Sequence, residues 1–433
     1  MITDLRQELH SRHLKEQFSA SAPDFTRHRR LTFARVALLI LRGHKVGLQN
    51  AVNKLFTDLE EVLLVPTASA YCQARQKLKP ELFRHLNGVV TRDFYQLSEA
   101  EGAVKRWRGH RLLGGDGTYL MLPETAETRA QFTVQKNQYA DGSCVQALAV
   151  VLYDLLNDLC VGAALGKRQG EKKLLFSEVW EATEVGDVIV LDRAYADYTV
   201  LASALAHHRH VVVRLPKRTF REAMAFWRSG KGEHVVRLRC PASARKFVTA
   251  HHLVEELKVR LIRVELEGGK VEVLMTTLVD QERYPASEFK AVYGWRWREE
   301  TFFDRLKNIF EVERFSGTTV TAIKQDFYGV LFLASLESVL SKRAEEELSE
   351  GATASQPPRP AKVNHAVSYV ALVERVVRLL LGEGSAEEVL EELHHLFGRS
   401  PTRVRIGREV ERRKGLRYAY KLRFHKYVKK IIA

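Results

Sequence analysis

The chain is poor in cysteine and contains no long run of apolar residues. Its 433 residues include four cysteines, which are Cys72, Cys144, Cys160 and Cys240. They lie far apart and form no C-x-x-C pair, so neither a secreted disulfide scaffold nor a thiolate zinc site is indicated. We expect these thiols to be reduced, structural and mostly buried.

Membrane and secretory signals are missing as well. Apolar runs such as 147–153 are far shorter than the roughly 20 residues that a membrane-spanning helix needs. The first residues, 1–6, lack a signal-peptide pattern. The sequence therefore predicts a soluble intracellular protein without a membrane partner.

Histidine pairs are present, but they do not form a metal motif. None of them belongs to an H-E-x-x-H pattern, and adjacent side chains point to different faces. The single His-x-His pair, His208 and His210, has no Cys or carboxylate ligand set beside it. A zinc site is therefore not expected.

Acidic residues are outnumbered by basic ones, and the excess is uneven. There are 68 Lys and Arg against 53 Asp and Glu, a net charge of +15. The segment 403–430 alone holds twelve Lys or Arg and only two acids, with aromatic residues interleaved. Such a tail is typical of a segment that binds a polyanion. A solubilising tail and a membrane-surface patch remain alternatives.

The periodicity of the chain divides it into regions. Residues 1–105 are helical in pattern, and Thr67 is a candidate N-cap for a helix carrying several cations. We predict a helical domain with a separate binding role; a plain helical bundle packed on the core is the alternative. The cations in and just after that helix are Arg75, Lys77, Lys79 and Arg84.

From residue 106 the pattern becomes α/β. Five strands are predicted. A helix at 171–184 lies between the third and fourth strands, and a helix at 198–208 lies between the fourth and fifth. The strands are 111–122, 144–153, 159–165, 188–191 and 211–215. We predict a core over 106–347, interrupted by a β-rich insertion at about 216–284 in which Gly268-Gly269 suits a hairpin turn.

The C-terminal part begins with a linker. Residues 348–362 include a Pro-, Ala- and Ser-rich stretch, and 363–433 is predicted to hold two helices, near 364–381 and 385–397, before the basic tail. A dimer contact is one possible role for this region, which the sequence leaves open.

One segment carries a distinctive spacing of polar residues. Tyr293, Arg296, Glu300 and Lys307 are offset by 0, 3, 7 and 14 positions, which on a helix places them within a stripe roughly 60° wide. The opposite side is apolar and can pack on a core. A stripe of one carboxylate between two cations and a phenol can hold a metal and a phosphate, although a solvated helix face is the plain alternative.

Two aspartates lie on strand-like runs. Asp116 sits in the glycine-containing run 111–122, and Asp192 directly follows the apolar run 187–191. Asp192 is therefore expected at the carboxyl end of a buried strand, where α/β sheets bind ligands. With Glu300 these residues offer hard oxygen ligands that suit Mg²⁺ or Mn²⁺ rather than zinc.

These motifs together resemble those of bacterial insertion-sequence transposases of the DDE class. The 293–307 segment is similar to their Y-(2)-R-(3)-E-(6)-K signature, Asp192-Arg-Ala-Tyr195 to their second motif, and Asp116-Gly-Thr to their first. The resemblance covers roughly residues 60–340. It implies a ribonuclease H-like α/β core with a β-rich insertion, flanked by a helical N-terminal domain, 1–105, that binds DNA ends and a helical C-terminal region.

The resemblance also implies an activity and its residues. Asp116, Asp192 and Glu300 would be the catalytic triad and hold two Mg²⁺ or Mn²⁺ ions. The expected DNA- and phosphate-binding residues are Tyr293, Arg296, Lys307, Trp297 and Arg193. An ion pair is the alternative for Arg193, and packing is the alternative for Trp297.

Cut-and-paste transposition of double-stranded DNA is the function that this resemblance implies. The expected partners are the terminal inverted repeats and target DNA, bound by a homodimer on paired ends at the nucleoid of a prokaryotic cytoplasm. Two alternatives remain: a ribonuclease H-like nuclease without strand transfer, and a DNA-binding regulator descended from a transposase.

Overall fold

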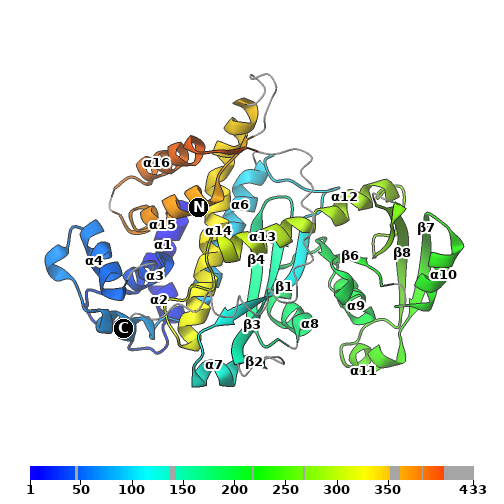
Figure 1. Cartoon of the computed structure of the whole chain (residues 1–433), viewed down its shortest axis with the longest axis horizontal. Coiled ribbons are helices and arrows are strands. Elements are labelled where there is room, and N and C mark those ends of the chain that lie inside the picture. The colour runs from blue at the N-terminus through cyan, green and yellow to red at the C-terminus, as the bar shows by residue number, and fades with distance from the viewer. Residues whose placement is uncertain are drawn as a thin grey trace.

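A computed structural model describes residues 1–43, 47–100, 102–136, 143–168, 170–216, 219–266, 269–351, 361–382 and 384–403. Helices from both ends of the chain gather at one side of a central sheet, and the strands of the predicted insertion form the other end (Figure 1). The predicted basic tail lies almost entirely outside the described residues, as does most of the linker.

The N-terminal region is helical, as predicted. Thr67 caps α5 by accepting a hydrogen bond from the Ala70 amide. The buried side chains of these helices belong to the same core cluster as those of the C-terminal helices. The helices are α1 (Ile2–His10), α2 (Arg12–Phe18), α3 (Phe33–Leu41), α4 (Leu48–Asp58), the short η1 (Val62–Leu64), α5 (Ala68–Arg75) and α6 (Glu81–Ala100).

Nine strands form one sheet. Its order is β2-β3-β1-β5-β6-β9-β8-β7, and β4 pairs with β3 on the same edge as β2, away from β1. The strands are β1 (Leu112–Leu122), β2 (Thr133–Lys136), β3 (Ser143–Asp154), β4 (Leu159–Gly166), β5 (Val188–Leu191), β6 (His210–Arg214), β7 (Glu233–Arg239), β8 (Glu256–Glu265) and β9 (Val271–Thr276). The five strands predicted in the core are confirmed to within one residue at each end.

The centre of the sheet is parallel and its flanks are antiparallel. Strand β1 runs parallel to β5 and β5 parallel to β6, whereas β3 is antiparallel to both β1 and β4. Alternate residues of β1, β3 and β5 point into two separate core clusters, one on each face. Both faces are therefore covered, as the nearly unbroken apolar character of β3 and β5 indicates.

The predicted insertion extends the central sheet. Strand β9 pairs antiparallel with β6, and β8 and β7 continue outward from it. Two helices in this segment, α10 (Arg221–Ser229) and α11 (Ala242–Ala250), were not predicted. Strand β2 and the short α7 (Ala126–Gln131) were also missed, because short elements carry too little periodicity to detect.

Helices connect and cover the strands. The segment predicted as one helix over 171–184 is α8 (Glu171–Leu174), followed by the wider π-helical turn η2 (Leu175–Val179) and the tighter 3-10 turn η3 (Trp180–Ala182). The second predicted helix is α9 (Tyr198–Ala206), preceded by the turn η4 (Arg193–Tyr195).

The signature segment is two helices rather than one. Following η6 (Ala286–Glu288), α12 (Phe289–Gly294) carries Tyr293, and α13 (Trp297–Asn308) begins after Arg296. The long α14 (Val320–Gly351) then packs along α6 and the C-terminal helices (Figure 1). The two C-terminal helices are confirmed as α15 (His365–Leu381) and α16 (Ala386–Arg399), flanked by the short pair β10 (Ala361–Lys362) and β11 (Thr402–Arg403).

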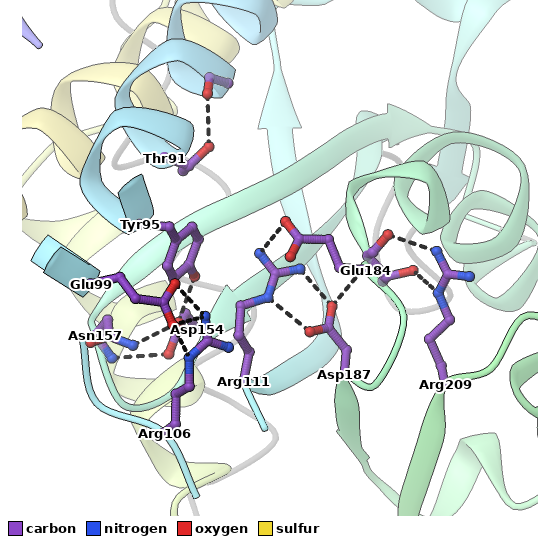
Figure 2. A network of polar contacts seen from close by, with 12 residues as sticks. Thr91, Tyr95, Glu99, Arg106, Arg111, Asp154, Asn157, Glu184, Asp187 and Arg209 are labelled. Atoms are coloured by element: carbon purple, nitrogen blue, oxygen red, sulfur yellow. Dashed lines mark hydrogen bonds and ion pairs between the residues drawn. The ribbon is translucent and has the colours of Figure 1, made fainter. Parts of the chain in front are cut away.

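A buried ion pair joins the amino ends of β1 and β5 (Figure 2). Arg111 donates to both carboxylate oxygens of Asp187, at 2.8 and 2.6 Å, and its guanidinium lies 4.9 Å from the ring centre of Tyr95. Tyr95 in turn donates a 2.6 Å hydrogen bond to Asp154 at the end of β3. The network therefore fixes how three neighbouring strands align at the end of the sheet opposite Asp116 and Asp192.

Two expectations from composition can be compared with the structure. All four cysteines are free; Cys144 and Cys160 are buried, whereas Cys72 is exposed. Among the described residues, no helix is long and apolar enough to cross a membrane.

Candidate active site

The two aspartates lie side by side on neighbouring parallel strands. Gly115 of β1 is paired with Leu191, the last residue of β5, so Asp116 and Asp192 follow at the same level. Asp116 lies within β1, which continues to Leu122, whereas β5 has ended. The sheet therefore opens beside Asp116, which is the kind of edge where α/β proteins bind ligands.

Local hydrogen bonds hold both carboxylates. Asp116 Oδ1 accepts a 2.8 Å hydrogen bond from the Gly117 amide, and Asp192 Oδ1 accepts one of 2.7 Å from the Ala194 amide. The second bond caps η4, the turn formed by the Asp-Arg-Ala-Tyr motif. Arg193 of that motif is exposed, so it is accessible to a ligand.

Glu300 is joined to Asp116 through Arg296. Arg296 Nη2 donates a 2.7 Å hydrogen bond to Glu300 Oε1, and its Nη1 lies 3.6 Å from Asp116 Oδ2. The Arg296 side chain is 8% exposed. A buried guanidinium thus links two of the three predicted carboxylates, and Asp192 lies at the level of Asp116 on the neighbouring strand.

Asp116 is crowded by other carboxylates. Burial, together with the charges of Glu171 and Asp192, raises its pKa from 3.8 to about 6, against the opposing effects of the Gly117 amide and Arg296. Because an anion costs more free energy in such surroundings, the site favours a proton or a cation beside Asp116.

The remaining signature residues surround this centre. The Arg296 guanidinium lies 5.7 Å from the ring centre of Tyr293 and 5.2 Å from that of Trp297. Trp297 is 49% exposed, which leaves its ring accessible for stacking. Lys307 Nζ donates a 2.8 Å hydrogen bond to the Tyr119 carbonyl, which ties α13 to β1.

Two glutamates at this site were missed by sequence reasoning. Glu299, next to Glu300, is fully buried against Gly114, and burial and the charge of Asp116 raise its pKa well above the ordinary value. Glu171, the first residue of α8, accepts a 2.7 Å hydrogen bond from the Tyr195 hydroxyl. A helix-start glutamate and a glutamate doublet are common in surface segments, so neither gave a usable signal.

One group of predicted DNA-binding cations is differently placed. Arg75 is 6% exposed and donates to Gln325, Ser316 and Asp326, so it holds α5 to α14 and its adjoining loop. Lys77 and Lys79 remain near the surface. Arg75 therefore forms a buried ion pair with Asp326, and its charge is already neutralised inside the protein.

The donor types at this site suit a hard divalent cation, but the described side chains are not arranged as a metal site. Asp116, Asp192, Glu300, Glu171 and Glu299 supply only carboxylate oxygens, which are the ligands that Mg²⁺ and Mn²⁺ prefer. Within the described part of the chain, no three His, Cys, Asp or Glu side chains are grouped closely enough to hold an ion. The Arg296 guanidinium lies between Asp116 and Glu300 in this arrangement.

Comparison with known proteins places the chain in a family. The family profile described as "Transposase DDE domain" matches residues 116–336, just over half of the chain, and begins at Asp116. This chain belongs to the transposase DDE domain family.

Two individual proteins are also similar. The transposase InsG for insertion sequence element IS4 of Escherichia coli K12 is 29% identical over 296 residues, which are 67% of this chain and 65% of that protein. The chain thus matches slightly under two thirds of its relative's length. A cryo-EM structure of the piggyBac transposase synaptic complex with hairpin DNA superposes with a TM-score of 0.41 at 8% identity, covering 92% of this chain and 85% of that one. A TM-score of this size does not establish a shared fold.

Proposed function

We propose that this protein is a cut-and-paste DNA transposase whose catalytic centre is Asp116, Asp192 and Glu300. The observation that carries the proposal is their convergence: two aspartates at the same level of parallel strands and a glutamate connected to one of them through Arg296. Membership of the transposase DDE domain family supports the same reaction class.

The strand order supports a ribonuclease H-like core for this proposal. The path β4-β3-β1-β5-β6, with β3 antiparallel and the last three strands parallel, corresponds to the strand, strand, strand, helix, strand, helix, strand order predicted from the sequence. In this description β7 to β9 with α10 and α11 form the insertion, residues 1–105 the DNA-end-binding region and 363–433 the C-terminal region.

Asp116, Asp192 and Glu300 would hold two Mg²⁺ or Mn²⁺ ions. Two such ions would activate the attacking oxygen and stabilise the leaving oxygen of an in-line displacement at phosphorus. The Arg296 guanidinium contacts both Asp116 and Glu300, so its positive charge would offset part of their negative charge.

The reaction uses one site with successive nucleophiles. In the first step water attacks phosphorus at a transposon end, the P–O3′ bond breaks, and a 3′-hydroxyl is released. That hydroxyl then attacks phosphorus in the opposite strand and displaces the 3′-oxygen of the flanking DNA, which closes a hairpin on the transposon end. A second water opens the hairpin and restores the 3′-hydroxyl, which then attacks phosphorus in target DNA and displaces a target 3′-oxygen. Arg296, Lys307, Tyr293 and Arg193 are proposed to hold phosphates near the triad, and Trp297 to stack on an unpaired base.

The proposed partners follow from the substrate. The protein would bind double-stranded DNA at the terminal inverted repeats and at the target, as a homodimer that pairs two ends, on the nucleoid of a prokaryotic cell. The net charge of +15 favours association with such a polyanion.

The triad can be tested with DNA carrying the inverted repeats that flank this gene. Asp116→Ala, Asp192→Ala and Glu300→Ala should each abolish strand cleavage and leave end binding largely intact, because affinity comes mainly from phosphate contacts elsewhere. Asp304→Ala removes an exposed carboxylate from the same helix as Glu300 and is the control, with activity retained.

The products of the same assay separate the alternatives. Cleavage followed by joining to target DNA supports transposition, cleavage without joining indicates a nuclease, and binding without cleavage indicates a regulator. Full cleavage by any triad variant would show that the assigned carboxylates are not catalytic.

A further inference from the structure

A fourth carboxylate, Glu171, reaches the triad from the other face of the sheet. In β1, Asp116 and Gly114 share the face that packs on α13, whereas Gly117 faces α8. A Cβ atom built on Gly117 would lie 2.8 Å from Glu171 Oε1. The Glu171 carboxylate therefore rests on the main chain of the residue that follows Asp116.

The geometry of the sheet explains how a group on this face can approach Asp116. Strand β5 ends at Leu191, while β1 continues to Leu122, so the edge of β1 beside residues 116–117 is not covered by β5. Of the carboxylates around Asp116, Glu171 has the largest effect on its pKa, ahead of Asp192. The negative charge of Glu171 thus acts directly on Asp116 of the triad.

Tyr195 holds Glu171 in this position. Its ring is 1% exposed, and its hydroxyl donates a 2.7 Å hydrogen bond to Glu171 Oε1. Tyr195 is the last residue of η4, the turn that Asp192 caps. The Asp-Arg-Ala-Tyr motif therefore places one carboxylate directly and a second one through its tyrosine.

The chain before Glu171 is shaped for this placement. Gly170 has φ +143°, a conformation that side-chain-bearing residues rarely adopt, and its carbonyl accepts a 2.7 Å hydrogen bond from the Leu174 amide to start α8. Lys172 Nζ lies 3.1 Å from Asp197 Oδ2, which ties α8 to the start of α9. These contacts keep Glu171 directed toward β1.

A second observation indicates that this cluster needs additional positive charge, from a cation or a proton. Glu299 is fully buried on the Asp116 face of β1, and within the described residues neither of its oxygens has a hydrogen bond of good geometry. The Tyr293 hydroxyl is likewise buried and without such a bond among the described residues. Unpaired buried polar atoms next to several carboxylates are costly unless a positive ligand or a proton is added.

We propose that Glu171 is a fourth acidic residue of the catalytic centre, held by Tyr195, and that it contributes to binding of the divalent cations. The inference rests on the proposed function only for the identity of the ligand. Glu171 would contact a cation directly or through a water molecule that lies between its carboxylate and the cation. Tyr195 would position the Glu171 carboxylate.

Binding of Mn²⁺ to the full-length protein without DNA tests this inference. The free ion is measured by electron paramagnetic resonance during titration of wild type, Glu171→Gln and Tyr195→Phe. We expect Glu171→Gln to weaken binding by about 10-fold or more and Tyr195→Phe to weaken it less, as for residues that orient metal ligands.

Matched variants control for charge and for hydroxyl loss. Glu178→Gln makes the same change at an exposed position in the turn that follows α8, and Tyr198→Phe removes a hydroxyl that donates to the Val254 carbonyl. Both should bind Mn²⁺ like wild type. Thermal unfolding of each variant without metal checks that the fold is retained, and Tyr195→Phe carries the test if Glu171→Gln does not fold.

The outcomes distinguish this inference from the proposed function. If Asp116→Ala and Asp192→Ala lose Mn²⁺ binding while Glu171→Gln and Tyr195→Phe keep wild-type affinity, the role of Glu171 is refuted and the transposase proposal stands. Absence of Mn²⁺ binding by wild type would also refute it. If the triad variants still cleave DNA, the transposase proposal fails, whereas the Mn²⁺ titration still reports on Glu171.

Discussion

At the scale of single residues, Asp116 links stability to pH. Its pKa in the folded protein is raised from 3.8 to about 6, first by burial and then by Glu171 and Asp192. The folded state therefore holds this proton more tightly than the unfolded chain. The stability gained in this way is present below about pH 4 and is lost as the pH rises through 6.

Asp116→Asn should accordingly stabilise the metal-free protein at neutral pH. A shift of one pKa unit corresponds to about 1.4 kcal/mol, so we expect a gain of roughly 1 to 3 kcal/mol at pH 7.5 that shrinks toward pH 4.5. Urea unfolding in the presence of a chelator measures both values. Asp304→Asn, at an exposed position of α13, should change neither; equal effects of the two substitutions would contradict the account.

Gly114 is needed because Glu299 occupies the space beside it. A Cβ atom at residue 114 would overlap Glu299 Oε2 and lie 2.9 Å from Leu155 Cδ2. Gly114→Ala should therefore push α13 away from β1, destabilise the protein by about 1 to 3 kcal/mol and reduce DNA cleavage by separating Glu300 from Asp116.

Gly88 in α6 offers a matched control for this change. A Cβ atom there meets nothing within 4 Å, so Gly88→Ala should be neutral or stabilising by up to about 1 kcal/mol. Denaturant unfolding and the cleavage assay compare the two variants. Wild-type cleavage by Gly114→Ala would show that the α13 to β1 contact does not position the site.

At the scale of elements, the alignment of β1 with β5 decides where the two aspartates lie. Arg111 and Asp187, one residue before the start of each strand, form an ion pair in which the side chains are 2% and 3% exposed (Figure 2). Because the pairing continues from Leu112 with Val188 to Gly115 with Leu191, this contact at one end sets the level of Asp116 and Asp192 at the other.

Arg111→Met should be strongly destabilising. It leaves the Asp187 carboxylate buried without its main partner, and removal of one member of a buried ion pair costs about 3 to 5 kcal/mol. Arg106→Ala breaks a pair with Glu99 whose side chains are 28% and 56% exposed, and should cost less than about 1 kcal/mol. Chemical denaturation gives both values; a small loss for Arg111→Met would mean that the strands align without this contact.

At the scale of the whole molecule, the excess of positive charge is concentrated at the C-terminal end. Twelve of the 68 Lys and Arg residues lie between 403 and 430, in a segment that follows α16. If this tail binds the DNA backbone, each phosphate contact releases counterions, and the affinity should fall steeply with salt concentration.

A chain ending at residue 403 should bind DNA more weakly and with a flatter salt dependence. The slope of log K against log salt concentration is expected to decrease by about 0.9 for each lost phosphate contact. Fluorescence anisotropy measures this slope when binding is titrated at salt concentrations from about 50 to about 300 mM. An unchanged slope would identify the tail as a solubilising segment, and cleavage at saturating protein should persist in either case.

The sequence by itself determined the five core strands and indicated three candidate site residues. Alternation and apolar runs located the five core strands to within one residue, because burial on both faces leaves a continuous local signal in β3 and β5. The helical spacing of Tyr293, Arg296, Glu300 and Lys307 located the signature segment, because this pattern is also local in the chain. The helix itself is interrupted at Trp295 and Arg296.

Only the tertiary structure decided which distant residues meet. The pairing of β9 with β6, the burial of Arg75 against Asp326 and the approach of Glu171 to Asp116 each join segments far apart in the chain. Such contacts depend on the order and alignment of strands, and no local pattern of hydrophobic or charged residues specifies them. The sequence therefore showed which carboxylates to expect on β1, β5 and α13, while the sheet edge beside Asp116 determined which other groups surround them.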